Sequence, residues 1–147
     1  RAPGVLVAAI RETFEETGLL LADDAAFAPP PALAEAPLWR ALGGLGRAPA
    51  LGRLAYVARA ITPTLSPRRF NTRFFMADAA YARGELVSEG ELLDLRWVAL
   101  ADVARILPVV DVTQFVLATV AGHLEGRAGE RVPLWRYVGN RSHVLYE

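Results

Sequence analysis

The feature that most constrains the fold is an amphipathic stretch over residues 5–17 that ends at a glycine. At about 100° per residue, apolar side chains that include Ile10 and Phe14 fall on one side of a helix, and three glutamates fall on the other. Gly18 follows directly and is the residue type that most often ends a helix. The pattern predicts a helix over residues 5–17 with a buried apolar side and an exposed acidic side.

The acidic side of this helix is unusually crowded. If Glu12 is placed at 0°, Glu15 falls at about 300° and Glu16 at about 40° around the axis. Such crowding costs roughly a few tenths of a kcal/mol per pair, and acids near a helix C-terminus also oppose its dipole. A hard cation such as Mg²⁺, which prefers carboxylate oxygens, would offset that cost. We therefore expect a metal site; the alternative is a solvated face with an Arg11 to Glu15 ion pair.

Composition narrows the function classes. The chain has 147 residues, 53% of them hydrophobic, so one domain with a single core is expected. Sixteen acidic and sixteen basic residues cancel, which leaves no overall field for nucleic acid or an anionic membrane. Every basic residue is Arg, which excludes lysine chemistry, and the absence of Cys excludes thiolates and cysteine-bound zinc. The apolar runs are too short to cross a membrane, and we expect a cytoplasmic protein.

Periodicity along the rest of the chain predicts a mixed α/β (α+β) fold with helices around a small mixed sheet. Residues 22–52 are rich in Ala, Pro and Gly and are interpreted as an insertion with helical pieces. Phe70 and Trp97 are expected in the core, with platforms that stack on a base as the alternative. The segments expected as strands are residues 54–61, 72–77, 92–98 and 132–138, and those expected as helices are residues 36–42, 100–106 and 111–125.

The acidic helix also resembles a known motif. The second half of the Nudix box has the order Arg-Glu-aliphatic-any-Glu-Glu-any-Gly-aliphatic, and the chain matches it with Arg11, Glu12, Glu15, Glu16, Gly18 and Leu19. Thr13 replaces the first aliphatic residue, and Pro3 stands where the first-half glutamate is expected. Residues 62–77 and 90–107 are similar to segments of the Nudix branch that includes peroxisomal coenzyme A diphosphatases and their bacterial relatives.

The resemblance implies a Nudix-type α/β/α sandwich with a small mixed sheet, as a single domain over residues 1–147. The strands that precede the box and the first half of the box are then expected to be missing. Three explanations stay open: truncation, disorder, and an insertion that splits the box.

The resemblance also implies an activity, which is divalent-metal-dependent hydrolysis of a diphosphate linkage in a nucleoside diphosphate derivative such as coenzyme A or acyl-coenzyme A. Glu15 and Glu16 would bind Mg²⁺ or Mn²⁺. Glu12 would be a further ligand or the base that activates water. Arg11 would orient Glu15 through a charge-assisted bond. Glu91 would add a metal ligand from a distant loop, with a solvated turn carboxylate as the alternative.

Arg68 and Arg69 are the candidate substrate-binding residues, because adjacent guanidinium groups suit phosphate recognition. The alternative is that both are surface charges beside a strand. The expected partner is a small-molecule diphosphate, with no nucleic acid and no membrane, and a homodimer is left open. Two other functions also stay open: hydrolysis of ADP-ribose or a nucleotide sugar, and a catalytically inactive Nudix-fold binding module.

Overall fold

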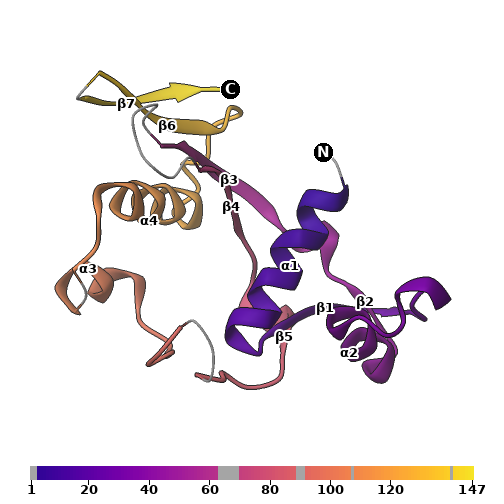
Figure 1. The fold of residues 1–147 in the computed structure, drawn as a ribbon. Coiled ribbons are helices and arrows are strands. Elements are labelled where there is room, and N and C mark those ends of the chain that lie inside the picture. The colour runs from indigo at the N-terminus through magenta and orange to yellow at the C-terminus, as the bar shows by residue number, and fades with distance from the viewer. Residues whose placement is uncertain (1–2, 63–69, 89–91, 107, 140) are drawn as a thin grey trace. The chain divides into compact units, whose positions relative to one another are not determined.

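The protein combines helices and strands, which confirms the predicted α+β class. The structure is a computed structural model that describes residues 3–62, 70–88, 92–106, 108–139 and 141–147. The chain divides into two compact units, one of residues 1–54 with 77–97 and one of residues 55–76 with 98–147. Each unit holds one sheet (Figure 1).

The first unit is built around a three-stranded antiparallel sheet in the order β2-β1-β5. Helix α1 packs against β1 and α2. The elements of the first unit, in chain order, are α1 (Pro3–Thr17), β1 (Leu20–Ala26), the 3-10 turn η1 (Pro31–Leu33), α2 (Pro37–Leu45), β2 (Arg47–Pro49), η2 (Leu51–Arg53), η3 (Ala79–Tyr81) and β5 (Ala82–Arg83).

The core of the first unit lies where α1 and α2 meet β1. Ile10 of α1 and Leu42 of α2 have no exposed surface, and Leu20 of β1 is almost fully buried. Burying each of these side chains contributes about 1.5–3 kcal/mol. The apolar side of α1 is therefore fixed against the sheet, which leaves its acidic side turned outward.

The second unit is built around a four-stranded sheet in the order β4-β3-β6-β7. Strands β3 and β6 run parallel, and the two outer pairs are antiparallel. Helix α4 lies in the connection from β4 to β6 and packs on β3. The elements of the second unit, in chain order, are β3 (Ala55–Ile61), β4 (Asn71–Met76), η4 (Leu100–Asp102), α3 (Val103–Ile106), α4 (Asp111–Leu124), β6 (Pro133–Val138) and β7 (Arg141–Tyr146).

Most elements agree with the sequence prediction. The structure confirms the acidic helix as α1, the helix at residues 111–125 as α4, and strands β3, β4 and β6. The helix predicted at residues 36–42 is α2, and the one at residues 100–106 is a 3-10 turn followed by one short α-helix. Residues 22–52 supply the end of β1, all of α2 and all of β2 to the first unit.

The strand predicted for residues 92–98 is wrong, because the described residues of this segment have no regular structure. Asp94 has a φ of 55°, a left-handed conformation that interrupts an extended backbone. The Leu95 amide donates to the Ser88 hydroxyl oxygen at 3.0 Å. The Leu93 side chain, predicted to be part of a strand, is 78% exposed.

The prediction that Phe70 and Trp97 are core residues is also wrong. Phe70 is 54% exposed and Trp97 is 70% exposed. Phe70 precedes β4, where its amide and carbonyl both bond to Thr62, so its backbone is fixed while its ring stays outside the core. Trp97 lies in the irregular segment that replaces the predicted strand.

None of the helices among the described residues combines the length and the apolar character that crossing a membrane requires.

Candidate active site

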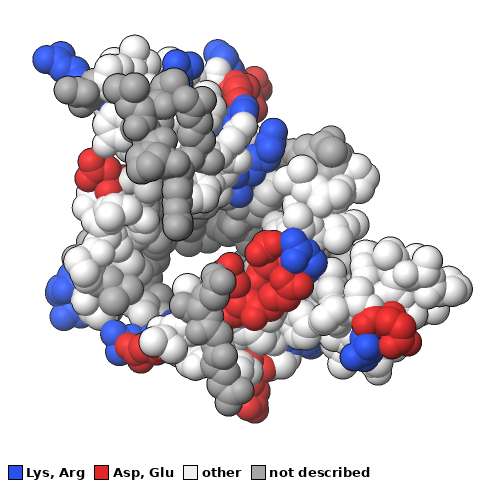
Figure 2. Space-filling view, viewed as in Figure 1, with Lys and Arg blue, Asp and Glu red and all other residues white. Residues whose placement is uncertain are grey.

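The acidic side of α1 is set by the burial of the opposite side. Ile10 is fully buried, whereas Glu12 and Glu15, on the other side, have side chains 53% and 39% exposed. Glu16 is half-buried. Figure 2 shows acidic side chains gathered over the region of α1 with basic atoms against them. The structure therefore brings the predicted carboxylates to one exposed helix face.

Arg11 contacts two of these carboxylates. Its Nη1 donates to Glu15 Oε2 at 2.8 Å, which is the bond expected from the sequence, and its Nη2 donates to Glu12 Oε1. No described side chain donates a hydrogen bond to Glu16. One guanidinium thus holds Glu12 and Glu15 together and leaves Glu16 outside the ion pair.

Thr13 occupies the position where the Nudix box has an aliphatic residue. Its hydroxyl donates to the Ala9 carbonyl at 2.9 Å, one helical turn back. Thr17 makes the same kind of bond to the Thr13 carbonyl at 2.6 Å. Because these bonds satisfy the hydroxyls within the helix, Thr13 fits the helix without a polar partner elsewhere.

Gly18 ends α1 in a conformation that only glycine adopts readily. Its φ is 77°, and its amide donates to the Phe14 carbonyl at 2.9 Å. A Cβ on Gly18 would lie 2.6 Å from the Glu85 carbonyl oxygen. Gly84 has a φ of 92°, and a Cβ there would lie 2.8 Å from the Gly18 carbonyl oxygen. Two glycines therefore allow the backbone at residues 84–87 to approach the end of α1.

This close approach creates a pocket of about 500 Å³ at the end of the acidic face. The Val87 amide donates to the Thr17 carbonyl at 3.0 Å and fixes the second segment against the helix. The lining includes three carboxylates and three apolar side chains, namely Glu15, Glu16 and Glu85 with Phe14, Pro37 and Val87. The pocket thus combines carboxylate oxygens with an apolar wall.

Glu85 is the residue of this pocket that sequence reasoning missed. It is exposed, and it enters the pocket because Gly84 and Gly18 meet. Residues 85 and 18 are far apart in sequence, so no local periodicity joins them. The sequence offers one signal, Gly84 directly before Glu85, which predicts a turn. It does not predict which other segment that turn contacts.

The other predicted site residues lie outside the described part of the chain. Arg68 and Arg69 fall in the gap between residues 62 and 70, and Glu91 falls in the gap between residues 88 and 92. Their position relative to the acidic face is therefore not given by the structure.

The chemistry of the acidic face suits a divalent cation, since its donors are carboxylate oxygens, which Mg²⁺ and Mn²⁺ prefer. Glu15 and Glu16 line one pocket with Glu85. Within the described residues, however, no three acidic, histidine or cysteine side chains are already close enough together to hold a metal ion. Arg11 pairs with both Glu12 and Glu15.

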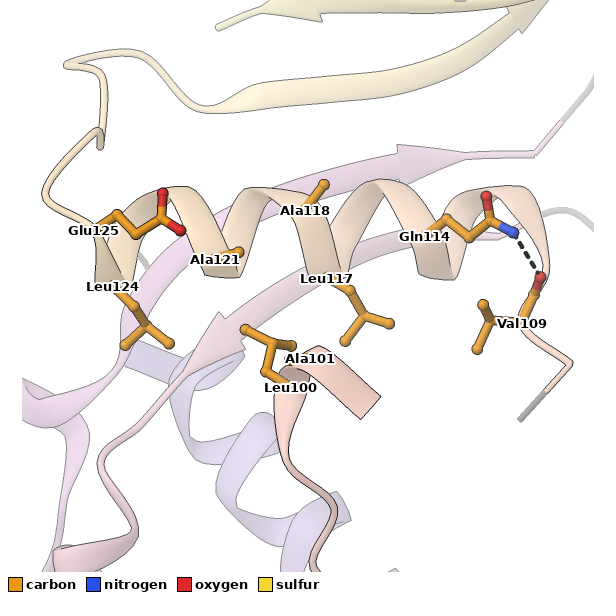
Figure 3. Close-up of a pocket in the computed structure, with 9 residues that line it drawn as sticks. All are labelled: Leu100, Ala101, Val109, Gln114, Leu117, Ala118, Ala121, Leu124 and Glu125. Carbon is orange, nitrogen blue, oxygen red and sulfur yellow. Dashed lines mark hydrogen bonds between the residues drawn. The ribbon is translucent and has the colours of Figure 1, made fainter. Parts of the chain in front are cut away.

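A second pocket, of about 600 Å³, lies in the other unit between α4 and η4 (Figure 3). Its walls are mainly Leu, Ala and Val side chains. At one end the Gln114 amide donates to the Val109 carbonyl at 3.1 Å. Of the predicted site residues that the structure describes, none lines this pocket, and its one charged lining residue is Glu125 among those described.

Comparisons of the chain with protein-family models, with curated proteins and with solved structures find no match. The chemistry of the residues and their placement are therefore what supports a functional proposal.

Proposed function

We propose that the protein is a divalent-metal-dependent hydrolase that cleaves a diphosphate linkage in a nucleoside diphosphate derivative. The observation that carries the proposal is the acidic face of α1, which ends at Gly18 beside a pocket that Glu15 and Glu16 line. Like charges on one helix face are unfavourable alone and become favourable with a hard cation. The same residues, in the same order, resemble the second half of the Nudix box.

Each residue of the face has a distinct role in this proposal. Glu15 and Glu16 would hold Mg²⁺ or Mn²⁺, because both carboxylates line the pocket. When bound, such an ion neutralises the diphosphate and polarises it toward attack by water. Glu12 would accept the proton of the attacking water or add a further oxygen ligand. Arg11 is a positioning residue that holds Glu15 by the 2.8 Å bond.

The substrate class follows from the resemblance and from charge. Coenzyme A carries a 3′-phosphate beyond its diphosphate, and this group needs a cationic contact of its own. The chain has no Lys, and Arg68 and Arg69 are adjacent arginines in the segment that resembles the coenzyme A branch. We therefore propose coenzyme A or an acyl derivative as the substrate, cleaved to 3′,5′-ADP and a phosphopantetheine product. ADP-ribose and nucleotide sugars are the alternative substrates.

A panel assay tests this proposal. Coenzyme A, dephospho-coenzyme A, ADP-ribose and a nucleotide sugar are incubated with the protein at saturating metal and equal ionic strength, and the products are separated by chromatography. We expect metal-dependent cleavage of coenzyme A, with dephospho-coenzyme A a poorer substrate. Outright preference for ADP-ribose, or equal rates with and without the 3′-phosphate, would contradict the substrate assignment while leaving the hydrolase intact.

Replacing Arg68 or Arg69 by Ala is expected to raise KM for coenzyme A about tenfold and to lower kcat less. The reason is that a guanidinium contact to a phosphate that does not react is made equally in the ground state and the transition state. Steady-state kinetics on coenzyme A and dephospho-coenzyme A measure the effect. Arg105→Ala, which removes an exposed arginine paired with Asp102, is the matched control. Unchanged KM in both variants would make Arg68 and Arg69 surface charges.

One observation favours a second function, that of an inactive binding module. Arg11 engages both Glu12 and Glu15. A guanidinium that neutralises these two carboxylates would let the pocket bind a ligand without cleaving it. The same panel separates the two functions, since a binding module would bind a diphosphate and release no product in the presence of Mg²⁺ or Mn²⁺.

A further inference from the structure

Two arginines of the second unit lie directly opposite each other in a strand pair. Arg59 of β3 is the register partner of Arg73 of β4. Like charges directly opposite in an antiparallel pair are destabilising. A negatively charged group beside this pair would offset that repulsion.

Glu147 supplies that charge, and each of its oxygens has its own donor. The Tyr56 hydroxyl donates to Oε1 at 2.9 Å, and Arg59 Nη1 donates to Oε2 at 2.7 Å. The carboxylate comes from the end of the β6-β7 hairpin, where Glu147 pairs with Val132 through two backbone bonds of 3.0 Å. Tyr56 and Arg59 thus donate to one carboxylate, and the charge of Arg73 also acts on it.

The donors are positioned by contacts that do not involve Glu147. Asn71 Oδ1 accepts from Arg59 Nε at 2.8 Å and orients the guanidinium. The Tyr56 ring packs against the Phe75 ring in a tilted arrangement with centroids 5.4 Å apart. Residues three apart on a regular strand face opposite sides, but the register of β3 shifts between Tyr56 and Ala58. This irregularity lets Tyr56 and Arg59 reach the same carboxylate.

The electrostatics show that these donors favour a charged oxyanion. The Tyr56 hydrogen bond, followed by the Arg59 hydrogen bond and the charges of Arg59 and Arg73, lowers the pKa of the Glu147 carboxyl. Burial, with the hydrogen bond to Glu147 as a further cause, raises the pKa of Tyr56 and keeps its hydroxyl a donor. The group bound here is thus held in its anionic form.

Charge favours a phosphate group as the natural occupant. Arg59 and Arg73 contribute two positive charges, whereas the side chain of Glu147 returns one negative charge. A phosphate monoester carries a charge of about −1.5 to −2 near pH 7 and offers three acceptor oxygens. It would balance both arginines, and its oxygens would accept from the Tyr56 hydroxyl and from guanidinium groups.

We infer that Tyr56, Arg59 and Arg73 form a binding site for a phosphate monoester group, and that the Glu147 carboxylate occupies this site when the ligand is absent. Ligand binding would displace Glu147 from Tyr56 and Arg59, so Glu147 is a competing internal anion. The site lies wholly in the second unit and is independent of metal binding at α1.

NMR titration with inorganic phosphate tests this site, with EDTA present and ionic strength held constant by chloride. Shifts of the arginine Nε–H signals and of the β3 and β4 amides report binding. We expect saturable binding by the wild type and about tenfold tighter binding by Glu147→Gln, since that variant removes the competing charge. Arg73→Gln and Tyr56→Phe should each bind phosphate about tenfold more weakly, and the control Arg105→Gln should match the wild type.

Two results would overturn the inference. One is Glu147→Gln that binds phosphate no more tightly than the wild type, which would make Glu147 a structural latch. The other is Arg73→Gln that binds as tightly as the wild type while thermal unfolding shows it to be folded. Tyr56→Phe keeps the ring that packs against Phe75, so it tests the hydroxyl without loss of that contact. Because no metal is present, failure here leaves the proposed hydrolase untouched.

Discussion

Glu15→Gln and Glu16→Gln are each expected to lower kcat for diphosphate hydrolysis by at least about a hundredfold. Each substitution removes one charged oxygen donor from the pocket at the end of α1. Loss of groups that only orient metal ligands already costs about 10–100-fold, and loss of a ligand itself costs at least as much. Initial rates over a range of Mg²⁺ and Mn²⁺ concentrations measure the effect.

The matched control for both variants is Glu35→Gln, which removes the same charge from a glutamate that is 92% exposed and paired with Arg40. It should hydrolyse substrate at the wild-type rate. All three variants should unfold at temperatures close to that of the wild type, because the exposed ion pairs of Glu15 and Glu35 contribute about 1 kcal/mol or less. Wild-type rates at low Mg²⁺ in either active-site variant would refute the metal role of that glutamate.

Gly18→Ala is expected to lower the free energy of unfolding by about 2–5 kcal/mol. A left-handed conformation costs a residue with a Cβ about 1–2 kcal/mol, and forcing an atom into an occupied space costs about 1–3 kcal/mol. At Gly18 both apply, since φ is 77° and the new Cβ would lie 2.6 Å from the Glu85 carbonyl oxygen. Urea denaturation followed by circular dichroism measures the change.

Gly44→Ala is the contrasting control. Gly44 lies in α2, and a Cβ there would meet no atom within 4 Å. Alanine in a helix is more stable than glycine by about 0.5–1 kcal/mol, so this variant should be as stable as the wild type or slightly more stable. If Gly18→Ala unfolded at the same urea concentration as Gly44→Ala, the contact between residues 18 and 85 would not exist in solution.

Residue periodicity within single segments predicts the helices and strands that form from local sequence alone. The acidic helix and its end at Gly18 follow from a 3.6-residue period and from glycine's access to a positive φ. Strands β3 and β4 follow from β-branched and aromatic residues bounded by Pro or turn residues, and helix α4 follows from its apolar stripe. The order of Arg11, Glu12, Glu15 and Glu16 placed these side chains on one face because a regular helix fixes their angles.

Features that depend on distant partners were not predictable from such patterns. The mainly apolar residues 92–98 suit a strand, but a strand needs a neighbour. Asp94 also turns the backbone into the left-handed region. Trp97 was expected in the core because it is large and apolar, yet its exposure depends on what packs over it. Residue 85 enters the candidate site only because two glycines far apart in sequence meet.

On the acidic face, too, the sequence pattern predicts one contact of Arg11 and leaves another unpredicted. A helical wheel predicted that Arg11 lies beside Glu15, and the 2.8 Å bond confirms it. The wheel did not predict the second bond from Arg11 to Glu12, which depends on the rotamers of two long side chains. Those rotamers decide whether the Glu12 carboxylate faces a metal ion or the Arg11 guanidinium. The angular position of Glu12 on the helix leaves both arrangements open.

The measurement that tests the central claim most directly is Mn²⁺ binding in the presence of a methylene-bridged diphosphonate, with free Mn²⁺ followed by electron paramagnetic resonance. The wild type and Glu35→Gln should bind Mn²⁺ with equal affinity, because Glu35 pairs with Arg40 away from the pocket lining. Glu15→Gln and Glu16→Gln should each bind it at least about tenfold more weakly. Equal Mn²⁺ affinity in all four proteins would contradict a metal site on the acidic face of α1.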